Sequence, residues 1–171
     1  NENTPALEYL MSKGVSRETL IGIWASGEIK DWGKVTNTDI KDSIHVYTRS
    51  DACGAAEIWA KYLGKRQEDL LGVGVYGDPG LAEAVRNDAL GIGFNNINYV
   101  YDSNTRMQIK GIRILPIDLN NNGIIDKNED FYNSLDQIIE AIRSERYPSP
   151  PAKDLHFVSQ GKPAKREVLE F

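Results

Sequence analysis

The chain has 171 residues, a formal net charge of −5 and a single cysteine. This length is enough for one well-buried domain, and the acidic balance argues against nucleic acid as a general partner. No apolar run in the sequence approaches the roughly 18 residues that a membrane-spanning helix needs. One cysteine excludes an internal disulfide. The chain opens on residues 1–5 without an initiator Met or a signal peptide, so we expect a piece of a longer, processed protein.

Helical and strand patterns alternate from the start of the chain. Apolar spacing predicts helices over residues 4–13 and 16–26, the second of them capped by Ser16. Residues 43–49 have the β-branched and aromatic character of a strand, and a helix over residues 52–63 follows at once.

The alternation continues through the second half. We predict a strand at 70–76, a short helix at 80–87, strands at 91–101 and 109–117, and a long helix within 131–146. Such alternation favours an α/β fold with a central mixed sheet flanked by helices.

A proline-rich segment at residues 147–151 follows the last predicted helix. Its prolines forbid helix and favour an extended crossing. Residues 154–161 then have the pattern of a further strand.

The loop at residues 48–57, after the first predicted strand, has features of an anion site. The first amides of a helix have no internal partners, and the helix dipole leaves that end partly positive. Gly54 lets a ligand approach the backbone closely, and Arg49 can offer a bidentate positive fork. The alternative is an ordinary helix cap at Ser50 or Asp51, with Arg49 paired to Asp51 on the surface.

Cys53 lies at the start of the same helix, where a thiol can be activated as a nucleophile. A nucleophilic cysteine also needs a positioned base, and the two histidines, His45 and His156, do not have suggestive spacings. We therefore expect Cys53 to pack as a small residue and the protein not to be an enzyme.

Two further segments have residues suited to a ligand cleft. The turn at residues 77–80 precedes a predicted helix and can direct a second helix N-terminus towards a cleft. Asn95, Asn96 and Asn98 can line a cleft, and they equally suit the end of a strand.

Residues 118–129 have the pattern of a calcium loop of the EF-hand type. Oxygen-bearing side chains occupy loop positions 1, 3, 5, 9 and 12, Gly123 provides the sharp turn at position 6, and position 7 offers its carbonyl. Ca²⁺ takes about six to eight hard oxygen ligands, which this spacing supplies. A polar Asn-Gly turn is the alternative. The predicted ligands are Asp118, Asn120, Asn122, Ile124, Asp126 and Glu129.

The segments that flank this loop indicate a structural site. In a paired EF-hand a helix precedes the loop, whereas residues 111–117 here contain Pro116 and have the character of a strand. The sequence has no second such loop, and a lone site cannot open a helix pair as calcium sensors do. We therefore expect Ca²⁺ as a structural cofactor that relieves repulsion among the loop carboxylates.

Three segments, Leu20–Trp32, residues 49–55 and residues 89–95, resemble a known family. They are similar to the "dIfsGkitnW" segment, the "RxDxSGT" anion loop and the "pgaIGYv" strand of phosphate ABC-transporter substrate-binding proteins. Their order is the same and their spacing is plausible over roughly residues 5–101. Residues 147–163 resemble the segment by which that family's chain returns to its first lobe.

The resemblance implies a type II periplasmic-binding fold, in which crossover strands join two α/β lobes around a ligand cleft. Residues 1–150 would then form the second, anion-binding lobe. Residues 151–171 would form a hinge crossover that leads towards a first lobe absent from this chain.

The resemblance also implies roles within the anion loop. Arg49 would clamp the anion, Asp51 would hold Arg49 in place, and backbone amides around Gly54 would donate hydrogen bonds. The family has Ser and Thr where this chain has Cys53 and Ala55. A thiol donates weakly and a methyl group not at all, and each lost charge-assisted hydrogen bond is worth about 1.5–3 kcal/mol. The identity and affinity of the anion are therefore open.

The sequence thus predicts an extracytoplasmic solute-binding protein that captures phosphate or a related tetrahedral oxyanion and delivers it to a membrane ABC permease. Ligand binding would close two lobes over the anion. The alternative is a calcium-stabilised surface or adhesion module that kept the fold and changed its ligand. Phosphate dependence would separate the two.

Overall fold

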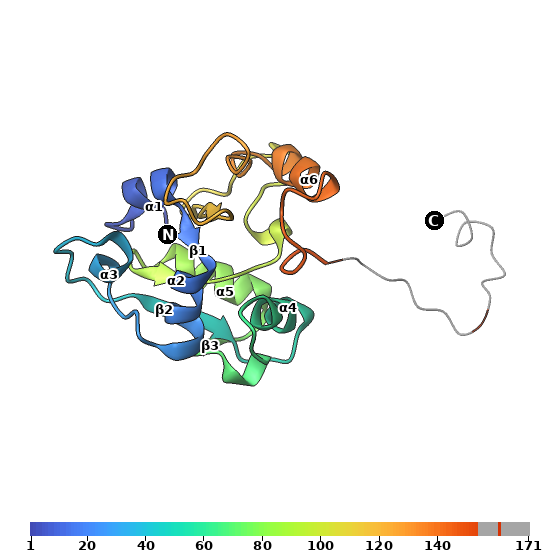
Figure 1. The fold of residues 1–171 in the computed structure, drawn as a ribbon. Helices are drawn as coiled ribbons and strands as arrows, with labels where there is room; N and C mark the ends of the chain where they lie inside the picture. The colour runs from blue at the N-terminus through green and yellow to red at the C-terminus, as the bar shows by residue number, and fades with distance from the viewer. Residues whose placement is uncertain (154–160, 162–171) are drawn as a thin grey trace.

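The computed structural model describes residues 1–153 and Gly161, and it combines helices with short strands (Figure 1). Each predicted helix is present, with ends within a few residues of those expected. Within the described residues, no helix has both the length and the apolar character needed to cross a lipid bilayer. The helices are α1 (Leu7–Lys13), α2 (Arg17–Ile21), which a π-helical turn at Gly22–Ser26 extends, α3 (Trp32–Thr36), α4 (Gly54–Tyr62), α5 (Gly77–Arg86) and α6 (Leu135–Arg143).

The strands form two small sheets in which all neighbours run parallel. β2 (His45–Arg49) lies between β3 (Val73–Val75) and β4 (Gly91–Ile92), while β1 (Val15–Ser16) pairs with β5 (Ile117–Asp118). A helix follows β2 and another follows β3, and such crossovers return the chain in the same direction. The prediction of one central mixed sheet is therefore wrong for the described residues. The register pairs Val15 with Ile117, Ser16 with Asp118, Tyr47 with Val73, Thr48 with Gly74, Arg49 with Val75, His45 with Gly91 and Val46 with Ile92.

Two predicted strands are much shorter than expected. The strand predicted at 91–101 is confined to β4, and the one predicted at 109–117 contributes only its last residue to β5. Gly111 has a φ of 91°, a left-handed conformation that takes the chain out of an extended path, and Pro116 has no amide to donate. Apart from Gly161, the strand predicted at 154–161 lies outside the described residues.

Two hydrophobic clusters form the core. The larger one lies around the β2 sheet and includes Trp24, which meets Trp59 edge to face with 5.4 Å between ring centroids. The smaller cluster joins α6 to the segment before it. Figure 1 shows α6 lying apart from β2 and β3. The buried members of the smaller cluster are Tyr101, Phe131, Tyr132, Leu135, Ile138 and Ala141.

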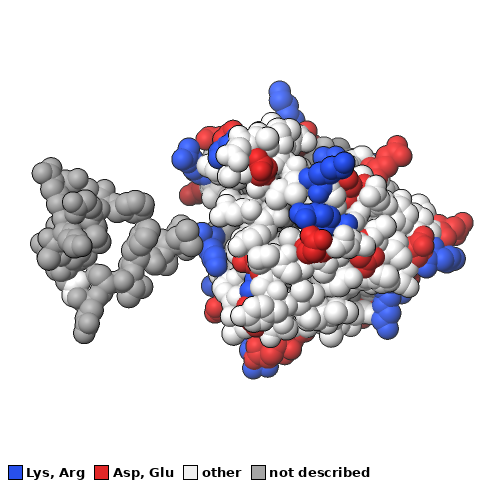
Figure 2. Space-filling view, turned by 180° about the vertical axis from the view of Figure 1, so that it is seen from behind, with Lys and Arg blue, Asp and Glu red and all other residues white. Residues whose placement is uncertain are grey.

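An open cavity of about 820 Å³ lies between the two clusters. Trp24 and Phe94 of the larger cluster line it together with Tyr132 and Ile138 of the smaller one. On the face that Figure 2 draws, acidic and basic side chains are scattered, many of them near the rim, and uncharged residues cover most of the surface between them.

Candidate functional site

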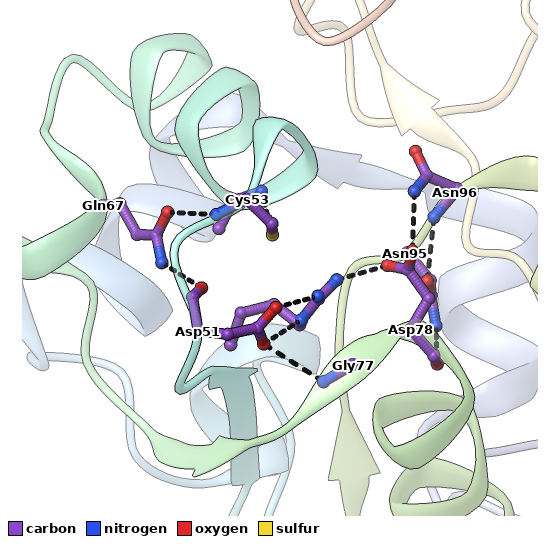
Figure 3. A network of polar contacts seen from close by, with 9 residues as sticks. Asp51, Cys53, Gln67, Gly77, Asp78, Asn95 and Asn96 are labelled. Carbon is purple, nitrogen blue, oxygen red and sulfur yellow. Dashed lines mark hydrogen bonds and ion pairs between the residues drawn. The ribbon is translucent and has the colours of Figure 1, made fainter.

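Arg49 ends β2, and its guanidinium contacts Asp51 and Asp78, two residues of the polar network drawn in Figure 3. Its Nε and Nη2 donate to the two carboxylate oxygens of Asp51, over 2.9 and 2.5 Å. The Arg49 side chain is only 6% exposed. A bidentate pair of this kind fixes the plane of the guanidinium. The carboxyl ends of parallel strands are also where open α/β sheets place their ligands.

Both partners of this pair remain charged. The hydrogen bonds from Arg49 and then from the Gly77 amide, 3.1 Å away, hold the pKa of Asp51 far below its ordinary value. The hydrogen bond to Asp51 in turn raises the pKa of Arg49. A lowered carboxyl pKa contributes stability above the unfolded value, near pH 4, which is lost only as the pH falls towards the folded value. Near neutral pH both Arg49 and Asp51 are therefore ionised.

A second carboxylate reaches Arg49 from α5. Arg49 Nη1 donates to Oδ1 of Asp78, a residue in the first turn of that helix. Figure 3 shows Asn95 and Asn96 beside Asp78. The Asn96 side chain donates to Asp78 Oδ2 over 2.9 Å, and the Asn95 side chain donates to the Asp78 carbonyl over 2.8 Å.

The turn at residues 77–80 and the asparagines at 95, 96 and 98, which were expected to face a cleft, contribute to the lining of the cavity. Asp78, Asn95, Asn96 and Asn98 all line the cavity. The pairing of Asp78 with Arg49 was not predicted, because the two residues lie 29 positions apart and only the tertiary fold brings them together.

Cys53 caps α4 and is tied into the same loop. Its Sγ accepts from the Ala56 amide over 3.4 Å, and its own amide donates to Gln67 Oε1 over 3.2 Å. The Gln67 side chain also donates to the Asp51 carbonyl over 2.7 Å, so it holds both ends of the loop (Figure 3). The thiol therefore caps the N-terminus of α4, and the partly buried Cys53 side chain packs against the larger core cluster.

No histidine among the described residues lies beside this thiol. His45 is at the opposite end of β2, where its Nδ1 lies 2.7 Å from Asp88. His156 lies outside the described residues. The structure thus gives Cys53 a capping role, and the one histidine within the described residues, His45, lies at the other end of β2.

Lys153 supplies a positive charge at the start of α4. A Cβ atom on Gly54 would lie 2.6 Å from Lys153 Nζ, so the ammonium lies beside Gly54, the first residue of α4. Lys153 forms no hydrogen bond or ion pair within the part of the chain that the structure describes. It lines the cavity together with Ala55 and Asp78. The position of Lys153 was not predicted, because it depends on the path of the proline-rich segment at residues 147–151.

The loop at residues 118–129 is folded around its own acidic side chains. The Asp118 carboxylate accepts from the amides of Asn122, at 3.1 Å, and Gly123, at 2.8 Å. Glu129 Oε1 accepts from the amides of Leu119 and Asn120. Asp118 and Glu129 are 6% and 3% exposed, and Gly123 has a φ of 78°. The turn at loop position 6 is thus the left-handed one that glycine favours.

This loop is attached to the start of the chain. The Ile125 amide donates to the Ser12 carbonyl over 3.0 Å, and Asp118 pairs with Ser16 in the β1–β5 sheet. Among residues 1–153 and Gly161, no three His, Cys, Asp or Glu side chains form a group that could hold a metal. The predicted calcium ligands also include two Asn oxygens and a backbone carbonyl, so calcium occupancy stays a prediction.

Comparison with known proteins places the fold. No curated protein matches the sequence. The crystal structure of a possible phosphate binding protein from Planctomyces limnophilus DSM 3776 is similar, with a TM-score of 0.60 and 14% identity. The match covers 85% of this chain and 46% of that one, so this chain spans about half the length of that protein. The family described as "PBP superfamily domain" matches residues 2–170. The chain therefore belongs to the periplasmic-binding-protein (PBP) superfamily.

Proposed function

We propose that this chain is the anion-binding lobe of an extracytoplasmic solute-binding protein that captures phosphate or a related tetrahedral oxyanion. One observation carries the proposal. In a chain of the PBP superfamily, Arg49, whose side chain is only 6% exposed, is held by Asp51 at the carboxyl end of β2, next to the N-terminus of α4. A fixed guanidinium beside free helix amides is the chemistry that recognises an oxyanion.

The site differs in its donors from the family it resembles. The Cys53 sulfur accepts from the Ala56 amide, and Ala55 has only a methyl group to present. The Lys153 ammonium lies over Gly54, where it can replace a lost hydroxyl donor. Lys153 brings a full charge as well as hydrogen-bond donors, so it can offset the missing Ser and Thr.

Replacement of Lys153 with alanine should weaken phosphate binding about tenfold or more, because one charge-assisted hydrogen bond contributes about 1.5–3 kcal/mol. Calorimetric titration of the full-length protein would measure the loss. Lys61→Ala is the matched control, since Lys61 lies in the last turn of α4 and removes the same charge from the other end of the helix. Equal affinities in the Lys153 variant and the wild type would remove Lys153 from the site.

The proposed function is tested by titrating inorganic phosphate into the full-length protein, with sulfate, molybdate and tungstate as competitors. Micromolar or tighter phosphate binding without turnover would support an uptake receptor. A response to another oxyanion alone would mean that the fold was kept and its specificity changed. The absence of measurable binding to all four anions would contradict the proposal.

The rest of the binding site would come from outside this chain. The similar structure, that of a possible phosphate binding protein, is about twice as long as the matched part, which covers 46% of it. We propose that residues 1–150 close against a first lobe, that residues 151–171 are the hinge crossover, and that a membrane ABC permease receives the anion. Contacts from both lobes would then favour the closed state.

We also propose that Ca²⁺ is a structural cofactor of the loop at residues 118–129. The ligands would be Asp118, Asn120, Asn122, Ile124, Asp126 and Glu129. The buried carboxylates of Asp118 and Glu129 and the left-handed turn at Gly123 support this assignment. Each carboxylate oxygen has more than one lone pair, so the hydrogen bonds from loop amides leave capacity for a cation.

The alternative function is a calcium-stabilised surface or binding module with a different ligand. The observation in its favour is the carboxylate of Asp78, which already occupies a donor of Arg49. Such a module would not respond to phosphate, whereas its melting temperature would still depend on calcium.

A further inference from the structure

The charge balance around Arg49 is unusual for a site that receives an anion. One guanidinium contacts two carboxylates, those of Asp51 and Asp78. A guanidinium has five N–H groups, and three are engaged by these two residues. The Arg49 charge is thus more than neutralised by residues of this chain.

The two carboxylates differ in position. Asp51 belongs to the loop after β2, and its backbone and side chain are held by Gln67 and the Gly77 amide. Asp78 lines the cavity, and its side chain is 20% exposed. Asp51 therefore contacts the guanidinium from within the loop, whereas Asp78 contacts it from the cavity lining, to which Arg49 itself does not contribute among the described residues.

Asp78 is stabilised where it lies. Asn96 donates to its second carboxylate oxygen, and Asn95 holds its backbone carbonyl. The first turn of α5, a helix of 10 residues, also favours a negative charge. The contact between Asp78 and Arg49 is thus supported by Asn95 and Asn96 and by the N-terminus of α5.

We infer that Asp78 limits the affinity of the site because its carboxylate competes with the bound anion for Arg49. This inference rests on the proposed oxyanion function and deepens it. An incoming oxyanion must either displace the Asp78 carboxylate from Nη1 or bind beside it, against like-charge repulsion. Affinity is thereby held below the value that Arg49, Lys153 and the α4 amides could give together.

Asparagine at position 78 isolates this effect. Asp78→Asn keeps the shape of the side chain and an oxygen that accepts from Arg49, and it removes the negative charge. Its NH₂ group can also donate to an anion. We expect Asp78→Asn to bind inorganic phosphate about ten- to a hundredfold more tightly than the wild type, the size of one charge-assisted interaction.

The test is calorimetric titration of inorganic phosphate into the full-length wild type, Asp78→Asn and a control. Asp136→Asn is the matched control, because Asp136 also pairs with an arginine, Arg106, but lies on α6 outside the cavity lining. Asp78→Ser serves as a second uncharged variant should the asparagine variant fail to fold. Circular dichroism verifies the fold of each protein.

The outcomes separate this inference from the proposed function. Tighter binding in the Asp78 variants and unchanged binding in Asp136→Asn would establish the competition. If Asp78→Asn bound phosphate and the wild type did not, the inference would be supported and phosphate would be refuted as the ligand of the native protein. Unchanged or weaker binding in the Asp78 variants, or no binding in any protein, would overturn the inference.

Discussion

Replacing Arg49 with alanine should abolish measurable phosphate binding by the full-length protein. Arg49 can bind an oxyanion only with its remaining N–H groups or after Asp78 moves, and two charge-assisted hydrogen bonds of about 1.5–3 kcal/mol each correspond to at least about a hundredfold loss. The variant would also leave Asp51 and Asp78 together without their common cation. That negative charge would repel the anion as well.

Two further variants show whether this loss belongs to the site. Arg49→Lys retains the charge but not the planar fork, so we expect intermediate affinity. Arg106→Ala is the control, since it breaks an exposed ion pair with Asp136 far from β2 in the sequence. If Arg49→Ala bound phosphate as the wild type does, with its circular dichroism unchanged, the anion site would have to be sought elsewhere.

Calcium should raise the melting temperature of the protein by roughly 5–10 °C. A ligand at a hundred times its dissociation constant stabilises the folded state by about 2.7 kcal/mol, and a chain of this size gains about 2–4 °C for each kcal/mol. The increment should vanish in Glu129→Gln, because position 12 of the loop supplies the bidentate carboxylate. Differential scanning calorimetry with calcium and with excess chelator measures it.

Glu129→Gln will lower stability even without metal, since Glu129 accepts from three loop amides, those of Leu119, Asn120 and Asp126. The relevant quantity is therefore the difference between the melts with and without calcium for each variant. Asp130→Asn removes the same charge from the neighbouring residue and should keep the full calcium increment. An identical wild-type melt in calcium and in chelator would rule out the site.

Local features of the fold were accessible from the sequence. Ser16 caps α2 as predicted, with its hydroxyl accepting from the Thr19 amide over 3.1 Å. The apolar spacing that predicted the last helix buries Leu135, Ile138 and Ala141 on one side of α6. Helix caps and apolar periodicity depend on residues within one or two helical turns, so a short stretch of sequence is enough to predict them.

Features that depend on distant residues were not accessible. The division of the strands into two sheets depends on which elements become neighbours, and nothing in the local pattern of residues 109–117 showed that only the last of them would pair. The contact of Asp78 with Arg49 and the position of Lys153 over Gly54 arise in the same way. Each joins elements that the sequence separates, and no local propensity encodes such contacts.

The β1–β5 pairing has a consequence for how the chain assembles. β1 precedes α2, and β5 follows every strand of the other sheet. The β1–β5 pair can therefore form only when the long segment between these two strands has folded back on itself. Bringing together two strands so far apart in the chain costs conformational entropy before the contacts between them form. Such pairings are therefore late steps in folding. Interactions that form late mainly slow unfolding. A cation at the end of β5 would therefore act on the lifetime of the folded lobe rather than on the speed of its formation, a distinction that stopped-flow unfolding and refolding rates resolve.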